Sequence, residues 1–169
     1  MADYGNMRRA DREILNFSEI VDVLRRGDVF RLGINGDPYP YVVPLSYGFE
    51  ALDYMNDGRG GIVLYIHGAA EGLKHELIAK NNHVCVEFDI FHGSLVHGEG
   101  IDRSITSEYE SVIGFGTIEL IKGADAEKGV SLLLDHAGHS DFSYDKAILN
   151  YIKVYKITLT DIKGKRNIL

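Results

Sequence analysis

The sequence predicts a mainly β protein with α-helices (class α+β), in which strands form a barrel and helices lie at its periphery. About six segments have the alternation and composition of strands, and three have the period of amphipathic helices. Short turns containing Gly, Asn and Asp connect several strands. Strands at this density favour a closed barrel, because closure removes unpaired edges. The length of 169 residues fits a single domain, 1–169.

The chain begins with a charged arm followed by a helix. Residues 1–15 contain too few apolar side chains for an independent element, so we expect an arm lying across the surface of the body. Residues 16–27 predict a helix that Ser18 caps and that ends at Gly27. The stripe expected to be buried consists of Ile20, Val23 and Leu24.

Two strands are predicted next, at residues 29–34 and 39–49, with the turn sequence Asn35-Gly36-Asp37 between them. Pro44 lies inside the second strand. Because proline has no N–H group to donate, one side of this strand is expected to lack a neighbouring strand. Such a free side is either an edge exposed to solvent or an edge that binds a ligand.

The segment 61–74, GIVLYIHGAAEGLK, joins a strand to the start of a helix predicted at 72–81. A hairpin arm at 50–57 and a turn at Asn56-Asp57-Gly58 lead into it. Apolar side chains occupy both faces of the strand, which is therefore expected inside the sheet. Small residues and Lys74 at the helix start offer N–H groups and an ammonium to a phosphate. The alternative is an ordinary turn with a solvated lysine, since small residues are common in turns.

The second half of the chain alternates strands and helices. Glycines and histidines at 90–107 follow no period, which predicts a short strand plus a long loop. Gly114 and Gly116 predict a bulge or bend in the strand at 109–122. The other predicted elements are a strand at 83–89, a helix at 124–136, a short helical segment at 144–150 and a strand at 154–162.

Charge and composition limit the classes of function. The 25 acidic and 18 basic residues give a net charge of −7, which disfavours binding to nucleic acid or to an anionic membrane. The single cysteine, Cys85, excludes an internal disulfide framework and a cysteine-based zinc site. No signal-peptide core or membrane-spanning segment is evident, so a cytoplasmic protein is expected.

Few motifs carry recognisable chemistry. His136 and His139 have a spacing that suits a metal, but Gly138 marks a helix end, where histidines serve as caps. No third ligand is fixed by spacing, and no metal site is predicted. The sequence contains no nucleophile elbow, P-loop or dinucleotide-binding fingerprint in its proper context. The residues alone therefore predict a barrel with an anion site near Lys74.

Several short segments, distributed in order over nearly the whole chain, form one combined pattern. They are Met7-Arg8-Arg9 with Asp11-Arg12-Glu13-Ile14, Pro40-Tyr41-Val42-Val43-Pro44-Leu45-Ser46-Tyr47, Tyr65-Ile66-His67 leading to Gly72-Leu73-Lys74, Tyr109-Glu110-Ser111-Val112 with Gly116, and Gly164-Lys165-Arg166. The combination resembles the pyridoxamine 5′-phosphate oxidase-related flavin-binding proteins, and most closely their nitroimidazole-resistance branch. The resemblance implies a split β-barrel that forms a homodimer, with one FMN at each of two sites between the subunits.

The resemblance also implies roles for individual residues. The phosphate of FMN would be held by Lys74 and by the backbone around Ala69, Gly72 and Leu73. The isoalloxazine ring would lie along Val43, Pro44 and Leu45, and the partner subunit would contribute Ser111 and Val112. His67 lies where this branch has a histidine near the flavin, and it is the candidate catalytic residue.

Two departures from the parent oxidases bear on the substrate. Leu73 stands where they have a second basic residue, and residues 163–169 lack a clear counterpart of their substrate-phosphate group. The predicted function is therefore an FMN-dependent oxidoreductase that reduces a small electron-poor substrate, such as a nitroaromatic, with electrons from a separate donor. Two alternatives remain open. One is a non-enzymatic flavin-binding or regulatory module, and the other is a haem-binding barrel with His67 or another histidine as axial ligand.

Overall fold

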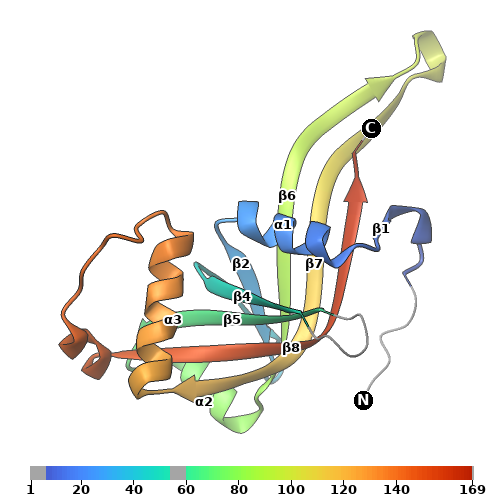
Figure 1. Cartoon of the computed structure of the whole chain (residues 1–169). Helices are drawn as coiled ribbons and strands as arrows, with labels where there is room; N and C mark the ends of the chain where they lie inside the picture. The colour runs from blue at the N-terminus through green and yellow to red at the C-terminus, as the bar shows by residue number, and fades with distance from the viewer. Residues whose placement is uncertain (1–6, 54–59, 169) are drawn as a thin grey trace.

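The computed structural model describes residues 7–53 and 60–168, so the turn predicted at 56–58 lies outside the described residues. One antiparallel sheet of eight strands makes up most of the fold (Figure 1). The strands are β1 (Glu13–Ile14), β2 (Phe30–Ile34), β3 (Tyr41–Leu45), β4 (Gly48–Asp53), β5 (Gly60–Ala69), β6 (His83–His97), β7 (Ser104–Ile121) and β8 (Ile152–Asn167). The helices are α1 (Phe17–Arg26), α2 (Leu73–Lys80) and α3 (Gly123–His136), with short 3-10 helices at Ala10–Arg12, Gly100–Asp102 and Lys146–Asn150.

The sheet is a split barrel. Its strand order is β3-β2-β6-β7-β8-β5-β4, and β1 pairs with β8 outside this path. Within the described residues β3 and β4 do not pair with each other, so the barrel is open between them rather than closed as strand density alone suggested. The α+β split barrel that the resemblance implied is confirmed. Pro44 lies in β3, which among residues 7–53 and 60–168 pairs only with β2, as its missing N–H group predicted.

Two apolar clusters hold the layers together. The larger one fills the barrel and includes Val23 and Leu24 of α1, which have no exposed surface. The smaller one lies between α3 and the outer face of β5 and β8, where Val63 and Tyr65 contact Ala126. Figure 1 shows α3 lying across these two strands. Strand β5 is therefore buried on both faces, in agreement with its continuous apolar sequence.

The prediction of a single strand at 39–49 is wrong. The structure has two strands there, β3 and β4, which lie at opposite ends of the strand order. The break occurs at Tyr47, which is 1% exposed. Its hydroxyl lies 2.5 Å from the carbonyl oxygen of Leu24 and 2.9 Å from that of Gly27. These contacts hold the buried ring against the C-terminal end of α1, at the point where the chain passes from β3 to β4.

The loop predicted within 90–107 is also wrong. Strands β6 and β7 stay paired as far as His97 and Ser104 and project beyond the sheet as a two-stranded ribbon (Figure 1). A register shift between Phe91 and Gly93 lies at the base of this ribbon. Side chains on both faces of the ribbon are largely exposed, so the sequence lacks the polar–apolar alternation of a half-buried strand.

The N-terminal arm is more ordered than predicted. Glu13 and Ile14 form β1, which pairs with β8, and Ile14 is only 5% exposed. Gly164 makes this contact possible, because a Cβ atom there would lie 2.9 Å from the Cβ of Ile14. Strand β8 accordingly continues to Asn167, beyond the end predicted at 162.

The cap of α1 and the irregularity in β7 are two local features that the sequence predicted. The N-cap of α1 is Asn16, whose side chain accepts a hydrogen bond from the Ser18 N–H at 3.0 Å, so Ser18 is not the cap. The predicted irregularity near Gly116 is confirmed by a register shift between Phe115 and Gly116. A Cβ atom on Gly116 would lie 2.0 Å from the carbonyl oxygen of Thr158. In the described part of the chain, no helix combines the length and apolar character needed to cross a membrane.

Candidate functional site

The turn between β5 and α2 presents a helix N-terminus that no side chain caps. Gly72 is the N-cap residue, and its φ of 134° is a conformation that only glycine adopts without strain. The His75 N–H donates to the Gly72 carbonyl oxygen at 3.0 Å and closes the first turn. The preceding N–H groups belong to the positive end of the helix dipole, which attracts an anion.

The Lys74 side chain folds back over the end of β5. A Cβ atom added to Gly68 would lie 2.7 Å from Lys74 Nζ and 3.5 Å from its Cε, so the ammonium occupies the space that a side chain would take. Desolvation alone lowers the pKa of Lys74, and no carboxylate among the described residues offsets it by forming an ion pair. A partly desolvated cation beside an uncapped helix start is chemically suited to a phosphate dianion.

His67 lies one residue before Gly68 but on the other face of the strand. The side chains of β5 alternate, with Ile66 in the barrel cluster and Tyr65 in the α3 cluster. The Lys74 ammonium therefore lies on the inner face, and His67 points to the outer face, where it is exposed. Although the side chain reaches solvent, partial desolvation of the ring, together with the positive charge of Lys74, lowers the pKa of His67.

The residues predicted to contact the flavin ring lie on the free edge of the barrel. Val43 and Leu45 pack against the barrel cluster, while Pro44 is exposed on the opposite face of β3. Helix α2 contacts β2, which is the strand that pairs with β3. Strand β3, predicted to contact the flavin ring, and helix α2, which carries Lys74, thus both adjoin strand β2 of the same chain.

Ser111 and Val112 lie elsewhere. Val112 has no exposed surface and points into the barrel, and Ser111 faces outward, paired with Lys165 of β8. Gly68 pairs with Lys153 of the same strand. At 3.3 Å per residue, Lys165 and Lys153 are roughly 40 Å apart along β8. Within one chain, Ser111 and Gly68 therefore lie beside opposite ends of the long strand β8.

Sequence analysis assigned no role to His75, which the structure places beside the Lys74 site. His75 is 8% exposed, and its Nδ1 atom lies 2.7 Å from the hydroxyl of Tyr155, which is 4% exposed. The signal was present in the sequence, because His75 and Ile78 are three residues apart and share the buried face of α2.

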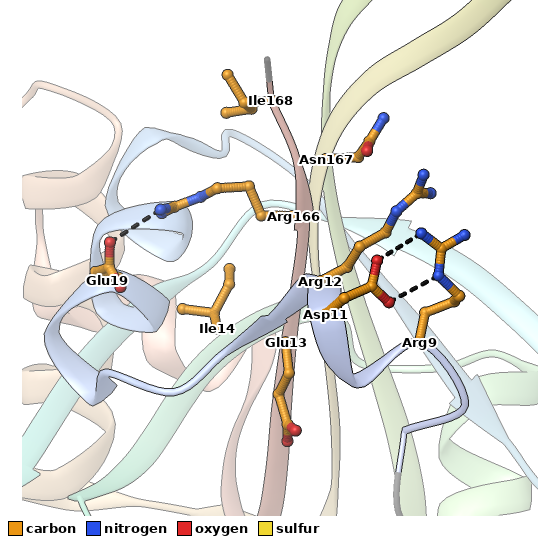
Figure 2. Close-up of a pocket in the computed structure, with 9 residues that line it drawn as sticks. All are labelled: Arg9, Asp11, Arg12, Glu13, Ile14, Glu19, Arg166, Asn167 and Ile168. Carbon is orange, nitrogen blue, oxygen red and sulfur yellow. Dashed lines mark hydrogen bonds and ion pairs between the residues drawn. The ribbon is translucent and has the colours of Figure 1, made fainter.

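A cavity of about 500 Å³ lies apart from these residues, between the N-terminal arm and the end of β8. Figure 2 shows that its charged side chains are largely engaged with one another. Arg9 contacts Asp11 at 2.6 Å, and Arg166 contacts Glu19 at 2.9 Å. The cavity contains none of the predicted site residues.

Behind this cavity lies a buried carboxylate, Glu110, whose side chain is 3% exposed. Arg26 of α1 contacts it at 2.7 Å, and His92 of β6 and Arg166 of β8 contact it at 3.0 Å. Burial alone would raise the pKa of Glu110, but these partners hold it at about 2. The network ties α1 to three strands and is best explained as structural.

Among the described residues, no group of three or more His, Cys, Asp or Glu side chains is placed to hold a metal ion. His136 instead contacts the Gly27 carbonyl oxygen through Nε2 at 2.7 Å. Cys85 is half-buried, and burial raises the pKa of its thiol, which disfavours a nucleophilic role.

Comparison with known proteins relates this arrangement to characterised folds. A family profile described as pyridoxamine 5′-phosphate oxidase matches residues 17–166. A solved structure of a candidate 5-nitroimidazole antibiotic resistance protein from Bacteroides thetaiotaomicron is 27% identical, with a TM-score of 0.73, over 91% of this chain and 86% of that one. No curated protein matches the sequence.

Two further structures share the fold at lower identity. The flavocytochrome Anf3 from Azotobacter vinelandii is 14% identical, with a TM-score of 0.75, over 97% of this chain and 73% of that one. An FAD-binding protein from Mesorhizobium loti is 24% identical, with a TM-score of 0.59, over 91% and 96% respectively.

Proposed function

Because the chain belongs to the pyridoxamine 5′-phosphate oxidase family, we propose that it is a homodimeric FMN-binding oxidoreductase that reduces a small electron-poor substrate. The observation that carries this proposal is the Lys74 ammonium, partly desolvated, lying over Gly68 beside the uncapped start of α2. A phosphate placed there would receive a charge-assisted hydrogen bond and would compensate the desolvated cation.

The free edge of β3 supports the position of the flavin ring. An edge strand leaves N–H and C=O groups without a strand partner, and Pro44 removes one donor at the point where another strand would have to pair. The polar rim of an isoalloxazine ring can bond to such backbone groups. Val43, Pro44 and Leu45 would then orient the ring while Lys74 and the turn at 69–72 hold the phosphate.

The separation of Ser111 from Lys74 supports a dimer. If both contact the same flavin, as the resemblance implies, Ser111 would come from a second copy, since within one chain the two residues lie beside opposite ends of β8. Val112 would act through its backbone, since its side chain is buried in the barrel.

The bound flavin would supply the electron-transfer chemistry, and the protein would bind and orient it. The exposed face of His67 offers an imidazole that can bond to a substrate near the strand end. The similarity to the candidate nitroimidazole resistance protein supports a nitroaromatic substrate. Leu73 stands where the parent oxidases have a second basic residue, and by the same resemblance this departure disfavours pyridoxamine phosphate as substrate.

The first experiment is an absorption spectrum of the purified protein, before and after reconstitution with FMN, together with its mass in solution. Flavin bands and a mass of twice 18.8 kDa are expected. A Soret band in place of flavin absorbance would select the haem alternative, which two features favour: an accessible His67, and a fold shared with a flavocytochrome. No bound chromophore after reconstitution would refute the proposal.

Lys74→Ala tests the phosphate site directly. Loss of a charge-assisted hydrogen bond worth about 1.5–3 kcal/mol should weaken FMN binding by at least tenfold. Lys80→Ala, an exposed lysine at the end of the same helix, is the matched control and should leave the affinity unchanged. Equal FMN affinities for both variants would show that the phosphate binds elsewhere.

Turnover separates an enzyme from a flavin-binding module. The native holoprotein, supplied with a chemical or enzymatic reductant, should reduce a nitroimidazole at a steady rate. Tight FMN binding without turnover of any nitro substrate would favour the non-enzymatic alternative.

A further inference from the structure

A buried histidine lies directly behind the proposed phosphate site. The His75 ring stacks on Tyr155 with their centroids 5.5 Å apart and their planes at 14°. The Tyr155 hydroxyl lies 2.7 Å from Nδ1, and the same imidazole faces the backbone of Ala69, whose carbonyl oxygen favours the protonated ring. Both rings are almost inaccessible to solvent, so these contacts are not replaced by water.

The charges around His75 favour the neutral ring. Desolvation lowers the pKa of His75, and the nearby ammonium groups of Lys153 and Lys74 lower it further. A neutral imidazole has one donor and one acceptor. Since the Ala69 carbonyl can only accept, the consistent assignment is an Nε2–H that donates to Ala69 and an Nδ1 that accepts from the Tyr155 hydroxyl.

These two contacts of His75 link the phosphate turn to the core of the barrel. Ala69 ends β5 and begins the turn that leads to Gly72, and Tyr155 is held in β8, where it pairs with Ile66 of β5. His75 follows Lys74 on the first turn of α2, and its Cε1 atom lies 3.9 Å from the position of a Cβ on Gly68. The imidazole therefore contacts the strand, the turn and the helix that together surround the Lys74 ammonium.

We propose that His75 is a positioning residue for the phosphate of the bound flavin. Anchored by Tyr155, it holds the Ala69 carbonyl on the inner side of the turn, so that the N–H groups of the turn and the Lys74 ammonium stay directed at the phosphate. This inference rests on the proposed function. It adds that His75 supports binding of the flavin phosphate, whereas binding of the flavin ring does not depend on His75.

Comparing FMN with riboflavin, which lacks the phosphate, tests this requirement. The full chain, stripped of flavin, is titrated with each ligand by calorimetry. His75→Asn places an acceptor near the position of Nδ1 but cannot reach Ala69, and it should weaken FMN binding about tenfold, the effect of losing one well-placed hydrogen bond near a charged ligand. Riboflavin affinity should remain within about twofold of native, because no phosphate contact is involved.

His75→Gln and Tyr155→Phe separate the two hydrogen bonds. Glutamine carries its amide donor near the position of Nε2, so it should restore FMN affinity to within about threefold of the native value. Tyr155→Phe keeps the ring and removes only the hydroxyl, and it should weaken FMN binding less than His75→Asn does. His97→Gln, an exposed histidine at the end of β6, is the control for histidine replacement.

The outcomes distinguish this inference from the proposed function. FMN binding by the native chain, with a selective loss in His75→Asn and its rescue in His75→Gln, supports the positioning role. The positioning role would be overturned, with the flavin site left intact, if His75→Asn lost equal affinity for FMN and riboflavin. The same conclusion would follow if the FMN affinities of the variants simply paralleled their melting temperatures. Failure of the native chain to bind FMN would overturn both.

Discussion

A methyl group added at Gly68 should weaken FMN binding without unfolding the protein. The Cβ atom of Gly68→Ala would lie 2.7 Å from Lys74 Nζ, whereas ordinary contacts of this kind begin near 3.4 Å. The ammonium must therefore move by about 0.7 Å, which it can do because it ends a flexible side chain. A charge-assisted hydrogen bond of about 2.8 Å would then stretch to about 3.5 Å, beyond useful range.

The expected result is an FMN dissociation constant raised about tenfold, corresponding to about 1.4 kcal/mol, with riboflavin affinity unchanged. The melting temperature should stay the same or rise slightly, since alanine restricts the unfolded chain more than glycine does. Gly33→Ala is the matched control, because a Cβ on that glycine of β2 would make an ordinary 3.5 Å contact with Cys85. Unchanged FMN affinity in Gly68→Ala, or an equal loss of riboflavin, would refute the placement of the phosphate.

Two further predictions concern the stability of the fold. The partners of Glu110 hold its pKa at about 2 against 4.5 when free, so its contribution of about 3 kcal/mol is complete above pH 4.5 and is lost as the pH falls towards 2. Denaturant unfolding should show Glu110→Gln less stable by that amount at pH 7 and by only about 1 kcal/mol near pH 2.5; a constant difference across this range would contradict it. Tyr47→Phe should lower the free energy of unfolding by about 1–2 kcal/mol, because the carbonyl oxygens of Leu24 and Gly27 lose a buried donor, and an unchanged midpoint in urea would contradict this.

The buried faces of a helix or strand could be predicted from the sequence where the pattern of apolar residues within that element reveals them. The apolar stripe of α1 and the two-sided apolar run of β5 both report directly which faces are covered. Pro44 indicated a free strand edge because the missing N–H group is a property of the residue itself. The anion site at Lys74 stays a prediction that rests on similarly local chemistry, a lysine at a helix start after small residues.

Features that depend on distant segments could not be predicted in this way. The break between β3 and β4 occurs at Tyr47, which reaches the carbonyl oxygens at the end of α1, about twenty residues earlier in the chain. The ribbon of β6 and β7 has two exposed faces, and a strand without a buried face leaves no periodic signal. The order of Ile14 depends on the absence of a side chain at Gly164, at the far end of the sequence.

By itself, then, the sequence determined the class of fold, the edge at Pro44 and the cation at Lys74, because each follows from the chemistry of a residue and its immediate neighbours. Tertiary structure decided what surrounds that cation. It placed the ammonium in the space left by Gly68, directed His67 to the opposite face of the strand, and packed His75 against Tyr155, eighty residues away. These contacts join separate segments, and the geometry of a binding site exists only once the chain has brought such segments together.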